Sequence, residues 1–142
     1  MKGMLWKSLA GCCLVVALAV AAIIFWNMRL DAGTGALKAG AYAEAYRELR
    51  PLAQLGDGHA QYLLGQMYAF GWGVPKSDDD AIRWFRKAAV WSKGTNDPAA
   101  AAEYYVGQAY AEGTGVPRNE AESQKWFRRA AAGGYKPSPN PS

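Results

Sequence analysis

The order of apolar and polar residues predicts one long apolar helix followed by shorter amphipathic helices. Residues 9–26 contain no charge and form a stretch about as long as the shortest helix that spans a bilayer. Residues 41–55 then place apolar side chains on one stripe at helical spacing, which predicts a helix with one buried face. This stripe consists of Ala45, Leu49, Leu52 and Ala53.

The next part of the chain predicts a helix, a turn and a second helix. Asp57 is placed to cap the first helix, which runs to about Phe70. Residues 71–75 form the turn, because glycine accepts the left-handed conformation at a helix end and proline prevents the helix from continuing. Ser77 caps the second helix, with Asp80 in the position of a capping-box acid. The apolar stripe of this helix consists of Ala81, Trp84, Phe85, Ala88 and Ala89.

The whole pattern recurs with a shift of 42 residues, as from Gly65 to Gly107. Asp97 is the expected cap of the repeated first helix, Pro98 takes its first position, and Asn119 caps the second helix. A self-match this dense indicates a repeat architecture, in which stacked helix pairs share a core. The repeated second stripe consists of Trp126, Phe127, Ala130 and Ala131.

The two copies resemble the Sel1-like repeat, which is similar to the tetratricopeptide repeat. The first copy carries the resemblance in Ala60, Leu64, Gly65, Tyr68, Gly71, Gly73, Val74, Pro75, Ala81, Trp84, Phe85, Ala88 and Ala89. In the second copy, Val106 replaces the leucine and Ser123 replaces the first alanine of the second helix. The resemblance implies an all-α fold, namely a short α-solenoid of helix hairpins that binds partner proteins along a concave face.

Residues 41–56 resemble the second helix of a degenerate first repeat. Arg50 and Ala53 match Arg86 and Ala89 at a shift of 36 residues, the usual length of this repeat. The pattern therefore divides the chain into seven parts. They are a cytoplasmic N-terminus (1–8), a transmembrane anchor (9–26), a linker (27–40), a degenerate first repeat (41–56), Sel1-like repeats at 57–97 and 98–135, and a disordered, proline-rich tail (136–142).

Two positions are expected to interrupt helical structure. Residues 31–40 are rich in glycine and alanine and are expected to form a link with at most a short helix near Ala36. Pro51 is expected to kink or end its helix near Arg50, because proline lacks the N–H that a helix interior requires. The extra length between the two full copies lies near residues 91–97.

The apolar stretch is either a cleaved signal peptide or an uncleaved membrane anchor, and the flanking residues favour the anchor. Small residues at 19–21 would suit a signal peptidase, but cleavage there would leave a very apolar mature start. Cys12 resembles a lipoprotein cysteine, yet it precedes most of the apolar stretch instead of following it. The basic flanks favour a cytoplasmic N-terminus, with Lys2 and Lys7 before the stretch. We therefore predict a single-pass bacterial inner-membrane protein with a periplasmic body, or alternatively a protein secreted to the periplasm after cleavage.

The remaining composition narrows the function. The net charge of +4 is mildly basic and does not by itself select nucleic acid, lipid or an acidic partner; we expect no nucleic acid partner. Both cysteines, Cys12 and Cys13, lie in the apolar stretch, so the chain lacks the paired helix cysteines of relatives linked to β-lactamase activity. His59 is the only histidine, and residues 78–80 are explained as helix-capping acids. We predict no catalytic, cofactor-binding or metal site.

The surface offers the candidate binding residues. Exposed aromatics serve as binding anchors in many interfaces, although stacked repeats also bury such rings. Basic side chains on the second helix of each copy would suit anionic headgroups or an acidic partner, or form a solvated face. The candidates are Tyr62, Phe70, Trp72, Tyr104, Tyr105, Arg83, Lys87, Lys125 and Arg129.

These features predict a non-enzymatic adaptor or scaffold that binds proteins at the inner membrane. The alternatives are a binder of an envelope polymer or anionic surface through the basic helix faces, and an envelope hydrolase, which is disfavoured by the lack of an acid–base pair. The last helix pair leaves one side uncovered, which predicts a surface for docking or self-association.

Overall fold

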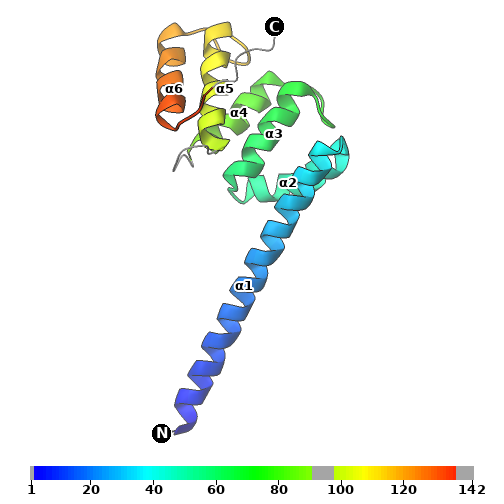
Figure 1. The fold of residues 1–142 in the computed structure, drawn as a ribbon, viewed down its shortest axis with the longest axis vertical. Coiled ribbons are helices and arrows are strands. Elements are labelled where there is room, and N and C mark those ends of the chain that lie inside the picture. The colour runs from blue at the N-terminus through cyan, green and yellow to red at the C-terminus, as the bar shows by residue number, and fades with distance from the viewer. Residues whose placement is uncertain (1, 91–97, 137–142) are drawn as a thin grey trace.

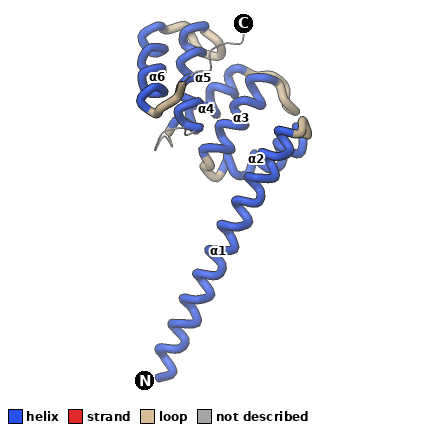
Figure 2. The backbone as a smooth tube through the Cα atoms, viewed as in Figure 1, coloured by secondary structure: helices blue, strands red, loops and turns tan. Residues whose placement is uncertain are grey.

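The computed structural model describes residues 2–90 and 98–136, and within these ranges all regular structure is helical (Figure 2). The all-α prediction is confirmed. The helices are α1 (Lys2–Lys38), α2 (Tyr42–Gln54), α3 (Gly58–Phe70), α4 (Asp78–Ala89), α5 (Pro98–Glu112) and α6 (Glu120–Ala132).

The helices form three antiparallel hairpins that stack into a short array (Figure 1). The C-terminal part of α1 pairs with α2, α3 pairs with α4, and α5 pairs with α6. Between hairpins, α2 packs on α3 and α4 packs on α5. The N-terminal part of α1 projects out of the array as a single long rod (Figure 1).

The expected link at residues 31–40 is wrong, because α1 continues without a break to Lys38. A Cβ atom on Gly33 would lie 2.7 Å from side-chain atoms of Leu49, so α1 and α2 approach as closely as glycine allows. Gly65 and Phe85 make the same close approach in the next hairpin. The end of α1 is therefore the first helix of the first hairpin, and packing against α2 outweighs the weak helix propensity of its glycines.

The expected end of the helix near Arg50 is also wrong, since α2 runs through Pro51 to Gln54. Leu52 and Ala53 directly after the proline are buried at 3% and 1% exposure. Proline within a helix costs about 3 kcal/mol, and the burial of Leu49 and Leu52, at about 1.5–3 kcal/mol each, offsets this cost. Leu55 N–H again donates to the carbonyl of Pro51, at 3.1 Å.

The predicted caps and turns are confirmed wherever the structure describes them. Side chains of Asp57, Ser77 and Asn119 each accept a hydrogen bond from the backbone N–H three residues later. Gly71 ends α3 with a φ of 71°, a left-handed conformation that favours glycine. The predicted cap Asp97 lies outside the described residues.

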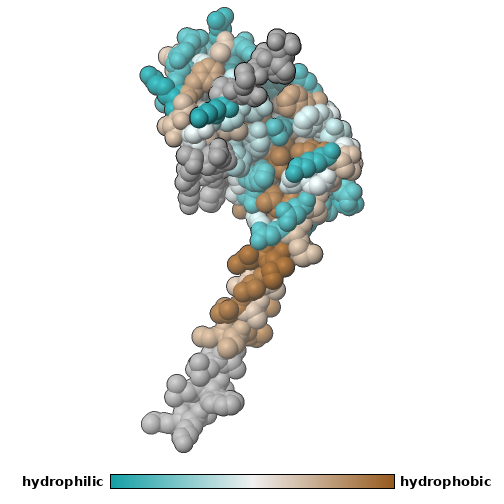
Figure 3. All heavy atoms as spheres, in the orientation of Figure 1, coloured by the Kyte–Doolittle hydropathy of each residue, from teal (hydrophilic) through white to brown (hydrophobic). Residues whose placement is uncertain are grey.

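The rod formed by α1 has the length and composition of a membrane-spanning helix. Cys12–Lys38 contains a window of mean hydropathy 2.1, and none of that window is buried in the protein. Large apolar side chains such as Leu14, Ile23 and Phe25 are exposed along it (Figure 3). A signal sequence near an N-terminus passes the same test, so the helix is a signal sequence or an anchor.

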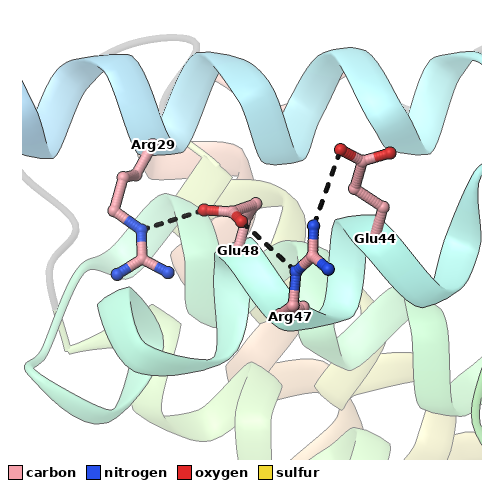
Figure 4. Close-up of polar contacts among 4 residues, drawn as sticks. All are labelled: Arg29, Glu44, Arg47 and Glu48. Carbon is pink, nitrogen blue, oxygen red and sulfur yellow. Dashed lines mark hydrogen bonds and ion pairs between the residues drawn. The ribbon is translucent and has the colours of Figure 1, made fainter.

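The rod is joined firmly to the array. Trp26 Nε1 donates to Asp57 Oδ2 at 2.9 Å, which ties α1 to the turn between α2 and α3. Arg29 Nε contacts Glu48 Oε2 at 2.9 Å, and Arg47 continues the chain of ion pairs from Glu48 to Glu44 (Figure 4). Polar contacts therefore fix the direction in which the rod leaves the first hairpin.

Candidate protein-binding surface

A row of aromatic rings crosses the two full repeats. Tyr62 of α3 lies 5.8 Å from Phe85 of α4 and 6.2 Å from Tyr105 of α5, measured between ring centroids. Phe85 and Tyr105 stack at 4.9 Å with an angle of 9° between their planes. Tyr104 meets Tyr105 edge-on at 6.3 Å. The structure thus brings together the three tyrosines predicted from the sequence, with Tyr62 and Tyr105 on the buried ring of Phe85 and Tyr104 beside Tyr105.

Helices α3 and α5, the first helices of the two full repeats, each also present a tyrosine and a glutamine that lie one helical turn apart. Gln66 Nε2 donates to the hydroxyl of Tyr62 at 3.0 Å, and Gln108 Nε2 donates to the hydroxyl of Tyr104 at 3.5 Å. All four side chains are half-buried. The sequence reasoning missed the glutamines, although they recur at the same shift of 42 residues as the tyrosines.

The hydroxyl groups of Tyr62 and Tyr135 act as neutral hydrogen-bonding groups. Burial is the main reason that the pKa values of Tyr62 and Tyr135 are raised above the ordinary value of tyrosine. Both hydroxyls therefore stay protonated at neutral pH and can donate hydrogen bonds. A surface of neutral phenols and amides suits contact with polypeptide, because peptide groups both donate and accept.

Two apolar hollows lie along this surface. The smaller one, about 110 Å³, lies where α3, α4 and α5 meet and is lined by Phe85 and Tyr105, among others. The larger one, about 320 Å³, lies beside α6 and is lined by Tyr104, Phe127, Ala130, Ala131 and Tyr135. Hollows of this size accept one or a few side chains from a partner.

The outer stripe of α6 is less covered than the sequence pattern predicts. Ala130 is buried, Trp126 and Phe127 are half-buried, and Ala131 is exposed. On α4 the equivalent stripe is covered by α5, whereas no described helix follows α6.

Phe70 and Trp72 lie apart from the tyrosine row, at the turn between α3 and α4. Their rings stack at 4.7 Å, and Trp72 stacks on Tyr42 at 5.7 Å with a 7° angle between planes. Trp72 therefore holds two hairpins together, while Phe70 remains exposed at the edge.

The four predicted basic residues differ in availability. Arg83 pairs with Asp80 at 3.0 Å on an exposed face, and Lys125 pairs with Glu122 at 3.4 Å. Lys87 Nζ lies 4.3 Å from the ring centroid of Trp84. These three side chains remain exposed.

Arg129 is also exposed, but its guanidinium pairs with a buried acid of the second repeat. Its Nε and Nη2 atoms both contact Glu103 Oε1, at 3.0 and 2.8 Å. The Glu103 side chain is only 2% exposed, and its second carboxylate oxygen has no hydrogen-bond partner among the described atoms. Arg129 thus neutralises a buried charge, a structural role that the sequence did not reveal.

The described residues offer no site for metal chemistry. Within residues 2–90 and 98–136, no three His, Cys, Asp or Glu side chains group in a way that could hold a metal ion. His59 is exposed at the start of α3, beside a hollow of about 540 Å³ that is also lined by Tyr135.

Comparison with known proteins finds Sel1 repeats in the same part of the chain as the two helix hairpins described above. Residues 58–89 and 100–135 match the Sel1 repeat. A solved Sel1 repeat protein from Oxalobacter formigenes is 34% identical, with a TM-score of 0.63 over 70% of this chain and 39% of that chain. No curated protein sequence matches this chain.

Two further solved structures share the fold. A protective antigen present in uropathogenic Escherichia coli strains, described as displaying an SLR fold, is 32% identical with a TM-score of 0.67, over 75% of this chain and 22% of that chain. The cysteine rich protein B of Helicobacter pylori is 21% identical with a TM-score of 0.62, over 82% of this chain and 88% of that chain, a likeness of fold alone. This chain thus spans well under half the length of the first two proteins.

Proposed function

Because this chain is a Sel1-repeat protein, and such repeats generally mediate protein interactions, we propose that it is a non-enzymatic adaptor of the bacterial envelope. The repeats face the periplasm and bind a partner protein, while α1 stays uncleaved in the inner membrane. Confinement to the membrane raises the effective concentration of the adaptor for partners in the same membrane.

The observation that carries the proposal is the repeated pattern of tyrosine and glutamine on α3 and α5. Tyr62 and Tyr104 offer rigid amphipathic rings, and Gln66 and Gln108 offer both donors and acceptors beside them. Rings of this kind give large contact area at a low cost in side-chain entropy. The two apolar hollows next to the row supply space for partner side chains.

The junction of α1 with the array supports the proposed anchor. Trp26 stands at the end of the apolar stretch, where an indole favours the membrane interface, and its N–H is bonded to Asp57. The end of the same helix forms part of the first hairpin, so the apolar stretch leads directly into the folded array. Cleavage at residues 19–21 would leave the apolar turn before Trp26 exposed to water.

The test is site-specific photocrosslinking in native membranes. A photoreactive residue at Gln66 or Gln108 should give a discrete protein adduct, and one at the exposed Gln124 of α6, a residue of the same type outside the row, should not. Adding Tyr104→Ala should weaken the adduct at Gln108, while circular dichroism shows the array still folded. Equal adducts at Gln124, or adducts unaffected by Tyr104→Ala, would remove the row from the interface.

Self-association is a second possibility for the hollow beside α6. A photoreactive residue at Ala131 would then yield an adduct of twice the mass of the chain. An adduct of another mass at this position identifies a different partner.

A further inference from the structure

The described hairpins meet at two junctions, which differ in the side chains that fill them. At the first junction, where α2 packs on α3, three aromatic rings stack on one another. The ring of Trp72 lies 5.7 Å from that of Tyr42 and 4.7 Å from that of Phe70, measured between centroids. These rings fill the end of the junction that lies next to the turn between α3 and α4.

The second junction, where α4 packs on α5, has no aromatic residue at the three equivalent positions. The first position begins the second helix of a hairpin and is related by a shift of 36 residues, and the other two are related by the shift of 42 residues. In this order, Tyr42, Phe70 and Trp72 correspond to Asp78, Glu112 and Thr114.

The backbone supports this correspondence between the two junctions. A Cβ atom on Gly73 would lie 2.7 Å from the side chain of Tyr42. A Cβ atom on Gly115, the equivalent glycine, would lie 2.7 Å from the backbone of Asp78. The two turns therefore approach the following positions in the same way, and only the side chains differ.

The three replacement residues all line the hollow of about 110 Å³ where α3, α4 and α5 meet. Its floor is apolar and includes the buried side chains of Ile82 and Phe85. Asp78 and Thr114 are half-buried and Glu112 is exposed, so these residues form the rim. The hollow therefore has an apolar floor and a polar rim, and it has room for about one side chain of a partner.

The rim of the hollow is negatively charged. None of the described residues that line it is basic. The Nζ atom of Lys76, an exposed side chain outside the hollow, lies 3.9 Å from Asp78 Oδ1, at the limit of an ion pair. The carboxylate of Glu112 makes no ion pair within residues 2–90 and 98–136. The hydroxyl of Thr114 and the amide of Gln108 add two further hydrogen-bond acceptors.

The helix dipole explains only one of the two acids. Asp78 begins α4, where a negative charge is favourable in any helix. Glu112 ends α5, where the same effect disfavours a negative charge, and the last turn of α5 contains no basic residue. A cation from outside the chain would therefore be stabilised both by the carboxylate of Glu112 and by the C-terminal end of α5.

We propose that this hollow binds a lysine or arginine side chain of the partner protein. The apolar stem of either side chain lies over Ile82 and Phe85, and its charged head reaches the carboxylates of Glu112 and Asp78. A long side chain with a cationic head thus takes the place that the stacked rings occupy at the first junction. This inference rests on the proposed protein-binding function and names the side chain by which the partner is recognised.

The test selects binders from a displayed library of random peptides, with the full chain in detergent micelles as the target. Peptides retained by the unchanged chain should share a lysine or arginine at one position. Glu112→Gln should weaken the binding of these peptides by about fivefold, the upper range for an ion pair with an exposed acid. Glu120→Gln removes the same charge at the exposed start of α6 and should leave their binding unchanged.

Reversal of the charge gives a readout that a purely structural role would not move. Glu112→Lys should select peptides with an aspartate or glutamate at the shared position. Glu120→Lys should select the same basic peptides as the unchanged chain. Selection of those basic peptides by Glu112→Lys would show that the carboxylate does not recognise the base.

A filled hollow provides an independent variant. Asp78→Tyr, Glu112→Phe and Thr114→Trp together copy the ring stack of the first junction, so the array should remain folded by circular dichroism. This variant should no longer retain the basic peptides. If it binds them as tightly as the unchanged chain does, the hollow is not their site.

The outcomes separate this inference from the proposed function. Peptides that share no base, or that share an apolar residue instead, overturn the inference and leave protein binding intact. A chain that retains no peptide also overturns the inference. If photoreactive residues at Gln66 and Gln108 then give no adduct in native membranes, the proposed function is overturned as well.

Discussion

The close approach of α3 and α4 gives the sharpest prediction, because one methyl group tests it. A Cβ atom on Gly65 would lie 2.5, 2.6 and 3.0 Å from three atoms of the Phe85 ring. Phe85 is 2% exposed and stacks on Tyr105, so the ring has little room to yield. Gly65→Ala must therefore push the two helices apart or displace the ring that joins the two repeats.

The magnitude follows from two opposed terms. Overpacking a buried site costs about 1–3 kcal/mol, and three atoms at or below 3.0 Å place Gly65→Ala near the upper value. Alanine gains about 1 kcal/mol over glycine within a helix, so the net loss of stability is about 2 kcal/mol. For a domain of this size, that corresponds to a melting temperature lower by about 10 °C.

Gly35 supplies a matched control within a helix of the same array. It lies in α1, and outside its own stretch of helix no atom lies within 4 Å of where its Cβ would be. Gly35→Ala should therefore raise stability by about 1 kcal/mol. Thermal unfolding of the full chain in detergent micelles, followed by circular dichroism, measures both. If Gly65→Ala is as stable as Gly35→Ala, the packing of α3 on α4 is described wrongly.

Two further predictions concern polar contacts. Glu103 is 2% exposed and its partner Arg129 is 46% exposed, so Arg129→Ala leaves a buried carboxylate without its cation. Solvent screens part of this pair, so the expected loss of stability is about 2–3 kcal/mol, below that of a fully buried pair. Arg128→Ala, at an exposed neighbouring position, should change stability by less than about 0.5 kcal/mol; chemical unfolding measures both. Two effects raise the pKa of Tyr68 to about 12: the hydrogen bond to Tyr46 is the larger, and burial is the smaller. This raised pKa stabilises the fold fully below pH 10, and the stability is lost as the pH rises toward 12. Tyr46→Phe should make the melting temperature fall less steeply across that range, and parallel curves for the two proteins would refute the assignment.

The sequence was sufficient for the local features of the repeats. Caps such as Ser77, the turn glycine Gly71 and the small residue Gly65 each follow from local chemistry, and the second copy supports each of them. Tyr62 and Tyr104 of the candidate surface recur at the shift of 42 residues, whereas Tyr105 corresponds to Leu63 in the first copy.

The features that the sequence missed depend on contacts between distant residues. Residues 31–38 are helical because Gly33 packs against Leu49 of α2. The sequence of this glycine-rich segment does not indicate that contact. In the sequence, Arg129 does not differ from an ordinary solvent-exposed base. Its role depends on Glu103, which precedes it by 26 residues and lies beside it only in the folded structure. Tertiary packing decides such cases over local propensity.

An uncleaved α1 with the repeats in the periplasm is central to the proposed function. The direct measurement labels Lys76→Cys, in a chain with Cys12→Ala and Cys13→Ala, with a membrane-impermeant maleimide in cells whose outer membrane has been made permeable. We predict a labelled protein of full-length mass in the membrane fraction before the inner membrane is broken. Labelling only after the inner membrane is broken, or a soluble protein shortened by about twenty residues, the length of a signal peptide, would contradict the account.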